Sequence, residues 1–246
     1  MPDNAIARAA QRLFVALDLP SAAEARALAS RLAPLGVGLK VGLELFTAEG
    51  PALVRELAAS APLFLDLKYH AIPETVARAV RAASRLGAAM ANLHVAGGEA
   101  MARRAVTARD EAAAAGEAAP ALIGVTVLTS LDAGDLRAVW GEGFAGDASD
   151  HARRLAGMAR DWGLDGVVAS AREAMAIRAE CGPDFLVVTP GIRPAGAAAG
   201  DQKRVLAPAD ALRAGASHLV VGRPVTRAAD PLSACRDILS EMAAGA

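Results

Sequence analysis

The sequence predicts an α/β fold of one domain, a closed (β/α)8 TIM barrel that spans residues 1–246. The first observation is order, because short apolar runs alternate with helical stretches rich in Ala, Arg and Glu, eight times along the chain. The second is length, because 246 residues is usual for such a barrel. The third concerns the rival fold, a doubly wound open sheet. The first turn, Asp18-Leu19-Pro20-Ser21, lacks the glycines that cradle a dinucleotide in that fold.

The eight predicted strands are short apolar runs of strand length. In chain order they are Leu13–Asp18, Val37–Val41, Leu63–Lys68, Met90–Val95, Ala121–Val127, Gly166–Ala169, Phe185–Thr189 and His218–Gly222. Eight helical segments lie between and after them. Ser21 with Glu24, and Ser170 with Glu173, are typical of capping boxes that open two of these helices. Pro73 suits the first turn of another helix.

Composition excludes several kinds of partner. The 26 Lys and Arg nearly balance the 27 Asp and Glu, so no basic excess predicts binding to nucleic acid or to a membrane. No apolar run approaches the roughly 18 residues of a spanning helix, and the N-terminus lacks the apolar centre of a signal peptide. Cys181 and Cys235 have no metal-ligand spacing. We therefore expect reduced thiols, a cytoplasmic location and no metal site.

Lysine is rare in this chain, and most of its lysines lie in predicted strands. Only three of the 26 cations are lysines, namely Lys40, Lys68 and Lys203, and the rest are arginines. Two of the three lie inside predicted apolar strands. Lysine is a compact proton donor whose pKa can be tuned, whereas arginine stays protonated. Lys40 and Lys68 are therefore candidates for chemistry, with chance retention as the alternative.

Charged side chains gather on one face of three consecutive predicted strands. Because strand side chains alternate between faces, the leucines around Asp66 and Lys68 take one face and these two residues the other. Lys40 is opposite its apolar neighbours in the same way, and Asp18 ends the first strand. Active sites of barrels are built at the C-terminal ends of the strands. We expect a preorganised array that holds Lys68 protonated beside a reacting atom, with a purely structural salt-bridge network as the alternative.

The last two strand-to-helix loops predict a phosphate site, which is their usual role in barrels. Glycine lets backbone amides approach an anion, and arginine can bind two of its oxygens. Gln202 is a candidate donor from a closing segment. The other candidates from these loops are Pro190, Arg193, Gly222 and Arg223. The alternative for Arg223 is a solvent-exposed cation at the rim.

Seven segments, read together and in this order, resemble the orotidine 5'-phosphate decarboxylases. They are Val15-Ala16-Leu17-Asp18, Leu39-Lys40-Val41-Gly42, Phe64-Leu65-Asp66-Leu67-Lys68, Val127-Leu128-Thr129-Ser130, Pro190-Gly191-Ile192-Arg193-Pro194, Asp201-Gln202 and Val221-Gly222-Arg223-Pro224. The resemblance covers nearly the whole chain. It implies a homodimeric barrel that converts the small-molecule nucleotide orotidine 5'-monophosphate to UMP and CO2. This is the last step of pyrimidine nucleotide synthesis, and the family uses no metal or organic cofactor.

The resemblance also implies roles for individual residues. Lys68 would protonate the C6 carbanion that remains when CO2 departs. Asp66 and Lys40 would orient Lys68 and balance its charge, and Lys40 would also reach the ribose, whose hydroxyls Asp18 would contact. The other implied contacts are Thr129 or Ser130 at the pyrimidine edge, Gln202 and Arg223 at the phosphate, and Ile72 and Thr75 at the neighbouring subunit's site.

Ala71 departs from the family pattern D-x-K-x-x-D-I-P-x-T, whose second aspartate falls on this position. Loss of that carboxylate would make the site more cationic. We expect substrate binding to survive and turnover to fall, because the missing charge would repel the substrate carboxylate more than the transition state. Ala71 could be an engineered change, a natural variant or the mark of a paralogue. Two rival functions stay open, a Mg2+-dependent sugar-phosphate decarboxylase or synthase of the same barrel type and a non-catalytic nucleotide-binding protein.

Overall fold

The computed structural model is a closed barrel of eight parallel strands in sequence order, so the fold prediction is confirmed. It describes residues 2–141, 147–194 and 206–245. The strands are β1 (Leu13–Ala16), β2 (Gly38–Gly42), β3 (Leu63–Tyr69), β4 (Met90–His94), β5 (Ala121–Val125), β6 (Gly166–Val168), β7 (Leu186–Thr189) and β8 (His218–Val221). Each strand differs from its predicted run by one or two residues at an end.

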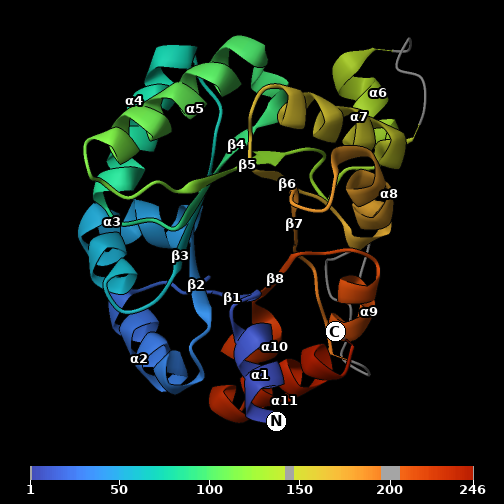
Figure 1. The fold of residues 1–246 in the computed structure, drawn as a ribbon. Coiled ribbons are helices and arrows are strands. Elements are labelled where there is room, and N and C mark those ends of the chain that lie inside the picture. The colour runs from blue at the N-terminus through green and yellow to red at the C-terminus, as the bar shows by residue number, and fades with distance from the viewer. Residues whose placement is uncertain (1, 142–146, 195–205, 246) are drawn as a thin grey trace.

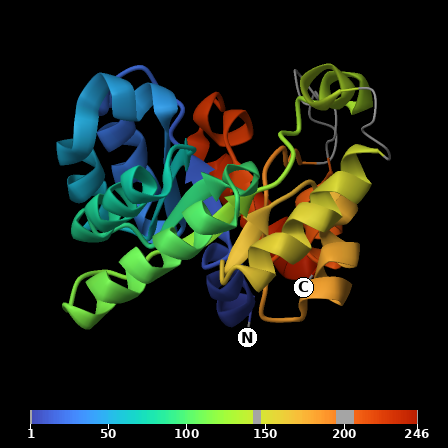
Figure 2. The ribbon, with the colours of Figure 1, turned by 90° about the horizontal axis from the view of Figure 1, so that it is seen from above.

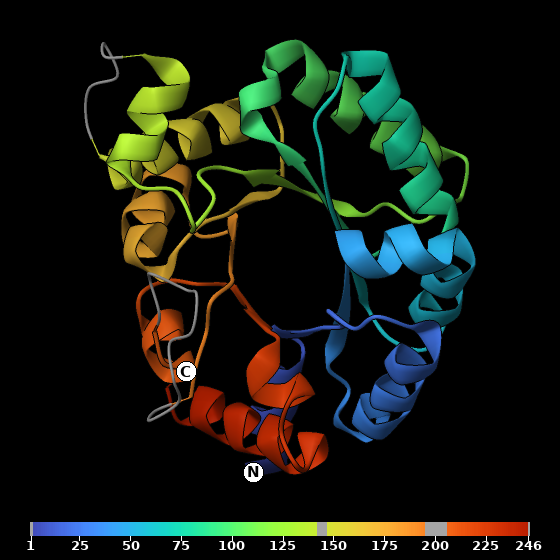
Figure 3. The ribbon, with the colours of Figure 1, turned by 180° about the vertical axis from the view of Figure 1, so that it is seen from behind.

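Helices form a ring around the barrel (Figures 1 and 3). They are α1 (Pro2–Ala10), α2 (Ala22–Leu32), α3 (Leu43–Ala58), α4 (Pro73–Arg85), α5 (Glu99–Ala114), α6 (Ala133–Trp140), α7 (Ala148–Asp161), α8 (Ala171–Cys181), α9 (Pro208–Arg213), α10 (Arg223–Thr226) and α11 (Pro231–Ala244). The described residues thus hold more helices than the eight predicted, because α1 precedes the barrel and the short α6 and α10 lie in loops. Helix α1 packs against α11, which brings the two ends of the chain close together (Figure 2).

The predicted helix starts are confirmed in part. Ser21 caps α2 by accepting a hydrogen bond from the amide of Glu24, and Ser170 caps α8. Glu173, however, accepts a hydrogen bond from the hydroxyl of Ser149 on α7 at 2.7 Å, where a capping box would direct it back to the cap residue. Pro73 begins α4 as predicted.

The inside of the barrel is filled by a separate apolar cluster. Its buried members are Phe14, Ala16, Phe64, Met90, Ile123, Val188 and Val220. Gly38 leaves room for the ring of Phe14, since a Cβ at that position would lie 2.5 Å from it. The next residues in alternation beyond Ala16, the last residue of β1, and Phe64 of β3 are Asp18, just past the end of β1, and Asp66. The cluster therefore forms a floor, and the charged residues lie above it at the C-terminal ends of the strands.

Candidate active site

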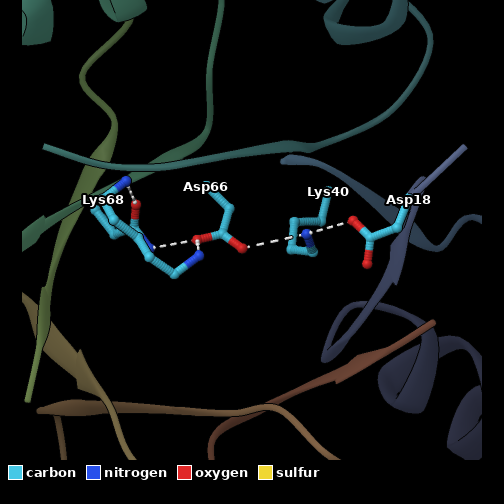
Figure 4. Close-up of polar contacts among 5 residues, drawn as sticks. Asp18, Lys40, Asp66 and Lys68 are labelled. Carbon is cyan, nitrogen blue, oxygen red and sulfur yellow. Dashed lines mark hydrogen bonds and ion pairs between the residues drawn. The ribbon is translucent and has the colours of Figure 1, made fainter. Parts of the chain in front are cut away.

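Four charged side chains form one alternating row at the C-terminal ends of β1 to β3 (Figure 4). Nζ of Lys40 lies 3.0 Å from Oδ1 of Asp18 and 3.2 Å from Oδ2 of Asp66. Nζ of Lys68 lies 2.6 Å from Oδ1 of Asp66. The predicted convergence of the three strands is confirmed, and all three ion pairs are within hydrogen-bond distance.

The row runs from a buried centre to an exposed end. The exposed fraction of the side chain is 8% for Lys40 and 13% for Asp66, but 59% for Asp18. Burial opposes the charge of Lys40, but attraction to Asp66 and Asp18 outweighs burial and raises the pKa of the ammonium. Burial likewise opposes the charge of Asp66, but Lys40 and Lys68 outweigh it and lower the pKa of that carboxyl. Both groups are therefore fixed in their charged forms at neutral pH.

Lys68 has an unusual backbone. Its φ of 51° lies in the left-handed region, the one such value at a non-glycine residue in the described part of the chain. That conformation costs about 1–2 kcal/mol for a residue with a Cβ. The pairing of β3 with β4 is irregular at the same point, between Leu65 and Tyr69. Strain of this kind is often found at functional sites, where the surroundings hold it in place.

Asn92 of β4 supports this backbone, and the sequence reasoning missed it. Its Oδ1 accepts a hydrogen bond from the main-chain amide of Lys68 at 2.7 Å. Its Nδ2 donates to Oδ1 of Asp66 at 2.7 Å. Asn92 is completely buried. An amide inside an otherwise apolar run, two positions after the inward-facing Met90, is the signal that could have identified it.

Two histidine rings lie at the same end of the barrel. The ring centroids of His70 and His94 are 5.3 Å apart. Burial lowers the pKa of His94, and the neighbouring His70 and Lys68 lower it further. His94 is therefore uncharged at neutral pH and adds no positive charge beside Lys68.

A cavity of about 600 Å3 opens over the row of charges, a size that suits a small-molecule ligand. Nine predicted site residues line it: Asp18, Lys40, Asp66, Lys68, Thr129, Pro190, Arg193, Gly222 and Arg223. Ser130 does not line it, which leaves Thr129 as the candidate from that loop. Ile72 and Thr75 are exposed at the start of α4 and do not line it either. Gln202 lies outside the described residues.

The cavity also has lining residues that sequence reasoning did not select, among them Leu43, Glu44, Leu128, Thr226 and Arg227. Among the described residues, five cationic side chains line it (Lys40, Lys68, Arg193, Arg223 and Arg227) against three carboxylates (Asp18, Glu44 and Asp66). This excess of positive charge favours an anionic ligand. Within the described ranges, no three His, Cys, Asp or Glu side chains are grouped as a metal site would need. No helix in those ranges combines the length and apolar character needed to cross a membrane.

The model of the orotidine 5'-phosphate decarboxylase / HUMPS family matches residues 11–238. The chain belongs to this family. Curated orotidine 5'-phosphate decarboxylases are similar along nearly their whole length. That of Moorella thermoacetica is 52% identical, with 95% of this chain and 93% of the relative covered. That of Alkalilimnicola ehrlichii is 54% identical, with 95% and 97% covered.

Solved structures agree with membership of the orotidine 5'-phosphate decarboxylase / HUMPS family. The crystal structure of orotidine 5'-phosphate decarboxylase from Lactobacillus acidophilus has a TM-score of 0.83 at 36% identity, covering 94% of this chain and 99% of the other. An uncharacterized conserved protein from Geobacillus kaustophilus has a TM-score of 0.79, also at 36% identity and with the same coverage. All nine cavity-lining residues that were predicted fall within the matched range 11–238.

Proposed function

We propose that this protein decarboxylates orotidine 5'-monophosphate to UMP and CO2, the last step of pyrimidine nucleotide synthesis. The observation that carries the proposal is the row of four alternating charges beside a cavity that Arg223 also lines. The cavity has the size and the positive charge for a nucleotide with a phosphate and a carboxylate. The names of curated relatives at 50% identity and above support the same substrate.

In the proposed reaction Lys68 is the proton donor. The bond between C6 and the carboxyl carbon breaks, CO2 leaves and the electron pair stays on C6. Lys68 then transfers a proton from Nζ to C6, which gives UMP, and the resulting neutral amine regains a proton from water. The ammonium stabilises the developing carbanion before it transfers the proton. Asp66, whose Oδ1 lies 2.6 Å from Nζ of Lys68, holds the ammonium in place.

The other lining residues are assigned to binding. Lys40 and Asp18 contact the ribose, and Thr129 reads the pyrimidine edge. The phosphate lies between the loops after β7 and β8, where Arg223 binds its oxygens. Remote phosphate binding of this kind can supply energy to the chemical step. Gln202 lies outside the described residues, and only the resemblance to orotidine 5'-phosphate decarboxylases assigns it to the same phosphate.

We further propose a homodimer in the cytoplasm, in which each subunit completes its partner's site. Ile72 is 72% exposed, and an apolar side chain of that size is expected to be covered in an assembly. Thr75 is exposed on the same helix start. Light scattering coupled to gel filtration measures the mass of the assembly, and Ile72→Glu should yield monomers. Cys181 and Cys235 are both free, as a reducing compartment requires.

A non-catalytic nucleotide-binding protein is the second candidate, and Ala71 is the observation that favours it. It would bind UMP but form none from orotidine 5'-monophosphate.

The deciding experiment combines two measurements on the purified protein. Calorimetric titration with UMP and with a 6-substituted UMP analogue tests the pocket irrespective of residue 71. Chromatography then follows UMP formation from orotidine 5'-monophosphate. We expect binding of both ligands and slow turnover that stops in Lys68→Met. Binding without turnover, even after Ala71→Asp, would identify a binding protein. Absence of binding, together with Mg2+-stimulated turnover of a sugar phosphate, would identify the other rival.

A further inference from the structure

The irregular pairing of β3 with β4 is centred on Asn92. Leu65 pairs with Ala91 and Tyr69 pairs with Leu93. Three residues of β3, numbers 66–68, therefore oppose one residue of β4. A bulge of this kind interrupts the ladder of main-chain hydrogen bonds and redirects the side chains it carries. Here the residues in the irregular stretch include both Asp66 and Lys68.

The side chain of Asn92 takes over one main-chain bond that the interrupted ladder cannot make, and it adds a second bond to a side chain. Its oxygen accepts the main-chain N–H of Lys68, and its nitrogen donates to Oδ1 of Asp66, both at 2.7 Å. Oδ1 of Asp66 also receives the ammonium of Lys68, while Oδ2 faces Lys40. Asn92 therefore holds both ends of the contact between the lysine and the carboxylate. It also fixes the rotation of the carboxylate, so that Oδ1 accepts from Lys68 and Oδ2 faces Lys40.

We propose that Asn92 is a positioning residue for proton transfer by Lys68. This inference rests on the proposed decarboxylase function. Asn92 does not line the cavity, so it acts through its two neighbours. One donor and one acceptor on a short, buried side chain are what the site requires. Leucine offers neither, and aspartate at neutral pH would place a second carboxylate against Asp66.

Three variants separate positioning from general packing. Asn92→Leu removes both bonds at similar volume. Asn92→Asp keeps the shape, and only its protonated form has both the donor and the acceptor. Thr126→Val is the matched control, because Thr126 is also buried and polar and binds a main-chain carbonyl, that of Val168, at 2.9 Å. Thr126 follows the neighbouring strand β5, and its hydroxyl donates to β6 and not to the charged row.

We expect Asn92→Leu to lower kcat about 100-fold while the Kd for UMP changes less than threefold. Thr126→Val should change neither value more than threefold. Asn92→Asp should be impaired at neutral pH and should recover as the pH falls. Its activity is divided by that of the parent at each pH, because the other ionisable groups at this site, His70, His94 and the charged row, are present in both proteins. A flat ratio, or an unchanged kcat in Asn92→Leu, would overturn the proposal.

A second readout does not depend on turnover. The chain has three lysines, so labelling lysine with 13C at Cε gives three side-chain signals, which Lys68→Arg and Lys40→Arg assign. Asn92→Leu should shift the titration midpoint of Lys68, because Asp66 and the Lys68 backbone are no longer held together. Thr126→Val should leave it unchanged. If the parent forms no UMP, the proposed decarboxylase function is refuted. The shift in the Lys68 midpoint still tests whether Asn92 positions Lys68. An unshifted Lys68 midpoint would refute it.

Discussion

Lys40 and Asp66 form a buried ion pair, with Nζ of the lysine 3.2 Å from Oδ2 of the aspartate. The pair links the exposed Asp18 to Lys68 and the cavity. Burying two charges is costly unless they are paired and hydrogen-bonded, and removing one partner leaves the other uncompensated. The row is therefore best understood as one unit, in which each charge fixes its neighbour in place before substrate arrives.

Lys68→Met tests the proton donor. The change keeps an unbranched side chain as far as Cε but removes the ammonium. We expect kcat to fall at least about 100-fold, the lower end of what a positioned acid contributes. Binding of UMP, measured by calorimetry, should weaken far less, because UMP has no leaving carboxylate. Lys68→Arg is the matched control. It keeps the charge but changes its geometry and pKa, so it should also be slow. Full activity in either variant would contradict the assignment.

Arg223→Ala tests the phosphate site. A hydrogen bond to a charged group contributes about 1.5–3 kcal/mol, so we expect kcat/KM for orotidine 5'-monophosphate to fall about 10- to 150-fold. Turnover should suffer as well as affinity, since phosphate binding supplies energy to the chemical step. Orotidine without its phosphate is the control substrate, and its kcat/KM should be the same for parent and variant. An unchanged kcat/KM for the nucleotide would refute the phosphate role.

Ala71→Asp tests the departure from the family pattern. We expect the rate of UMP formation to rise at least about tenfold, because the added carboxylate opposes the substrate carboxylate more than the departing CO2. Affinity for UMP should stay the same or fall. Ala71→Asn is the control of matched shape, and it should not restore turnover because it carries no charge. A protein that remains inert with aspartate at this position, even at high concentration, would contradict the decarboxylase proposal.

The ion pair of Asp66 and Lys40 should shape the pH dependence of stability. The pKa of Asp66 is lowered from its ordinary 3.8, so its contribution is present above that pH and is lost as the pH falls through the folded value. The pKa of Lys40 is raised from its ordinary 10.5, so its contribution is present below that pH and is lost as the pH rises through the folded value. Urea unfolding at a series of pH values measures the contributions of both groups to the free energy of unfolding.

The matched variant for this experiment is the double change Asp66→Asn with Lys40→Met. It should be less sensitive to pH than the parent at both extremes. If the free energy of unfolding of the two proteins stays parallel from acid to alkaline pH, the pair makes no contribution that depends on titration.

Two glycines give a paired test of packing. Gly166 lies in β6, where a Cβ would overlap the main-chain carbonyl of Leu186 on β7. Gly157 lies in α7, with nothing within 4 Å of the same position. Gly166→Ala should lower the free energy of unfolding by about 1–3 kcal/mol, a typical cost of overpacking. Gly157→Ala should raise it by up to about 1 kcal/mol, since alanine favours the helix. Equal effects in urea unfolding would contradict the described strand packing.

The alternation of side chains along a strand predicted part of the inner face of the barrel. The apolar neighbours of Asp66 and Lys68 predicted that both charges face inward, and the ion pairs confirm it. Alternation holds as far as Asp66, which pairs with Gly42 of β2, because the two faces of a barrel strand meet different surroundings. At Lys68 the pairing with β4 is irregular, so its inward position also depends on its contacts with Asn92 and Asp66. Thr129 and Ser130 could not be separated in the same way, because they follow the strand, where no regular periodicity holds. The cavity includes Thr129 and leaves out Ser130.

The sequence by itself determined the order of strands and helices, the barrel and the identities of the four charged residues, because these follow from local periodicity and composition. Only the tertiary structure decided that Asn92 supports Lys68 and that the backbone of Lys68 is left-handed. Both depend on the register between β3 and β4, which are 20 residues apart in the chain. Pairing between strands is a property of two segments at once, so the sequence of either strand alone does not specify it.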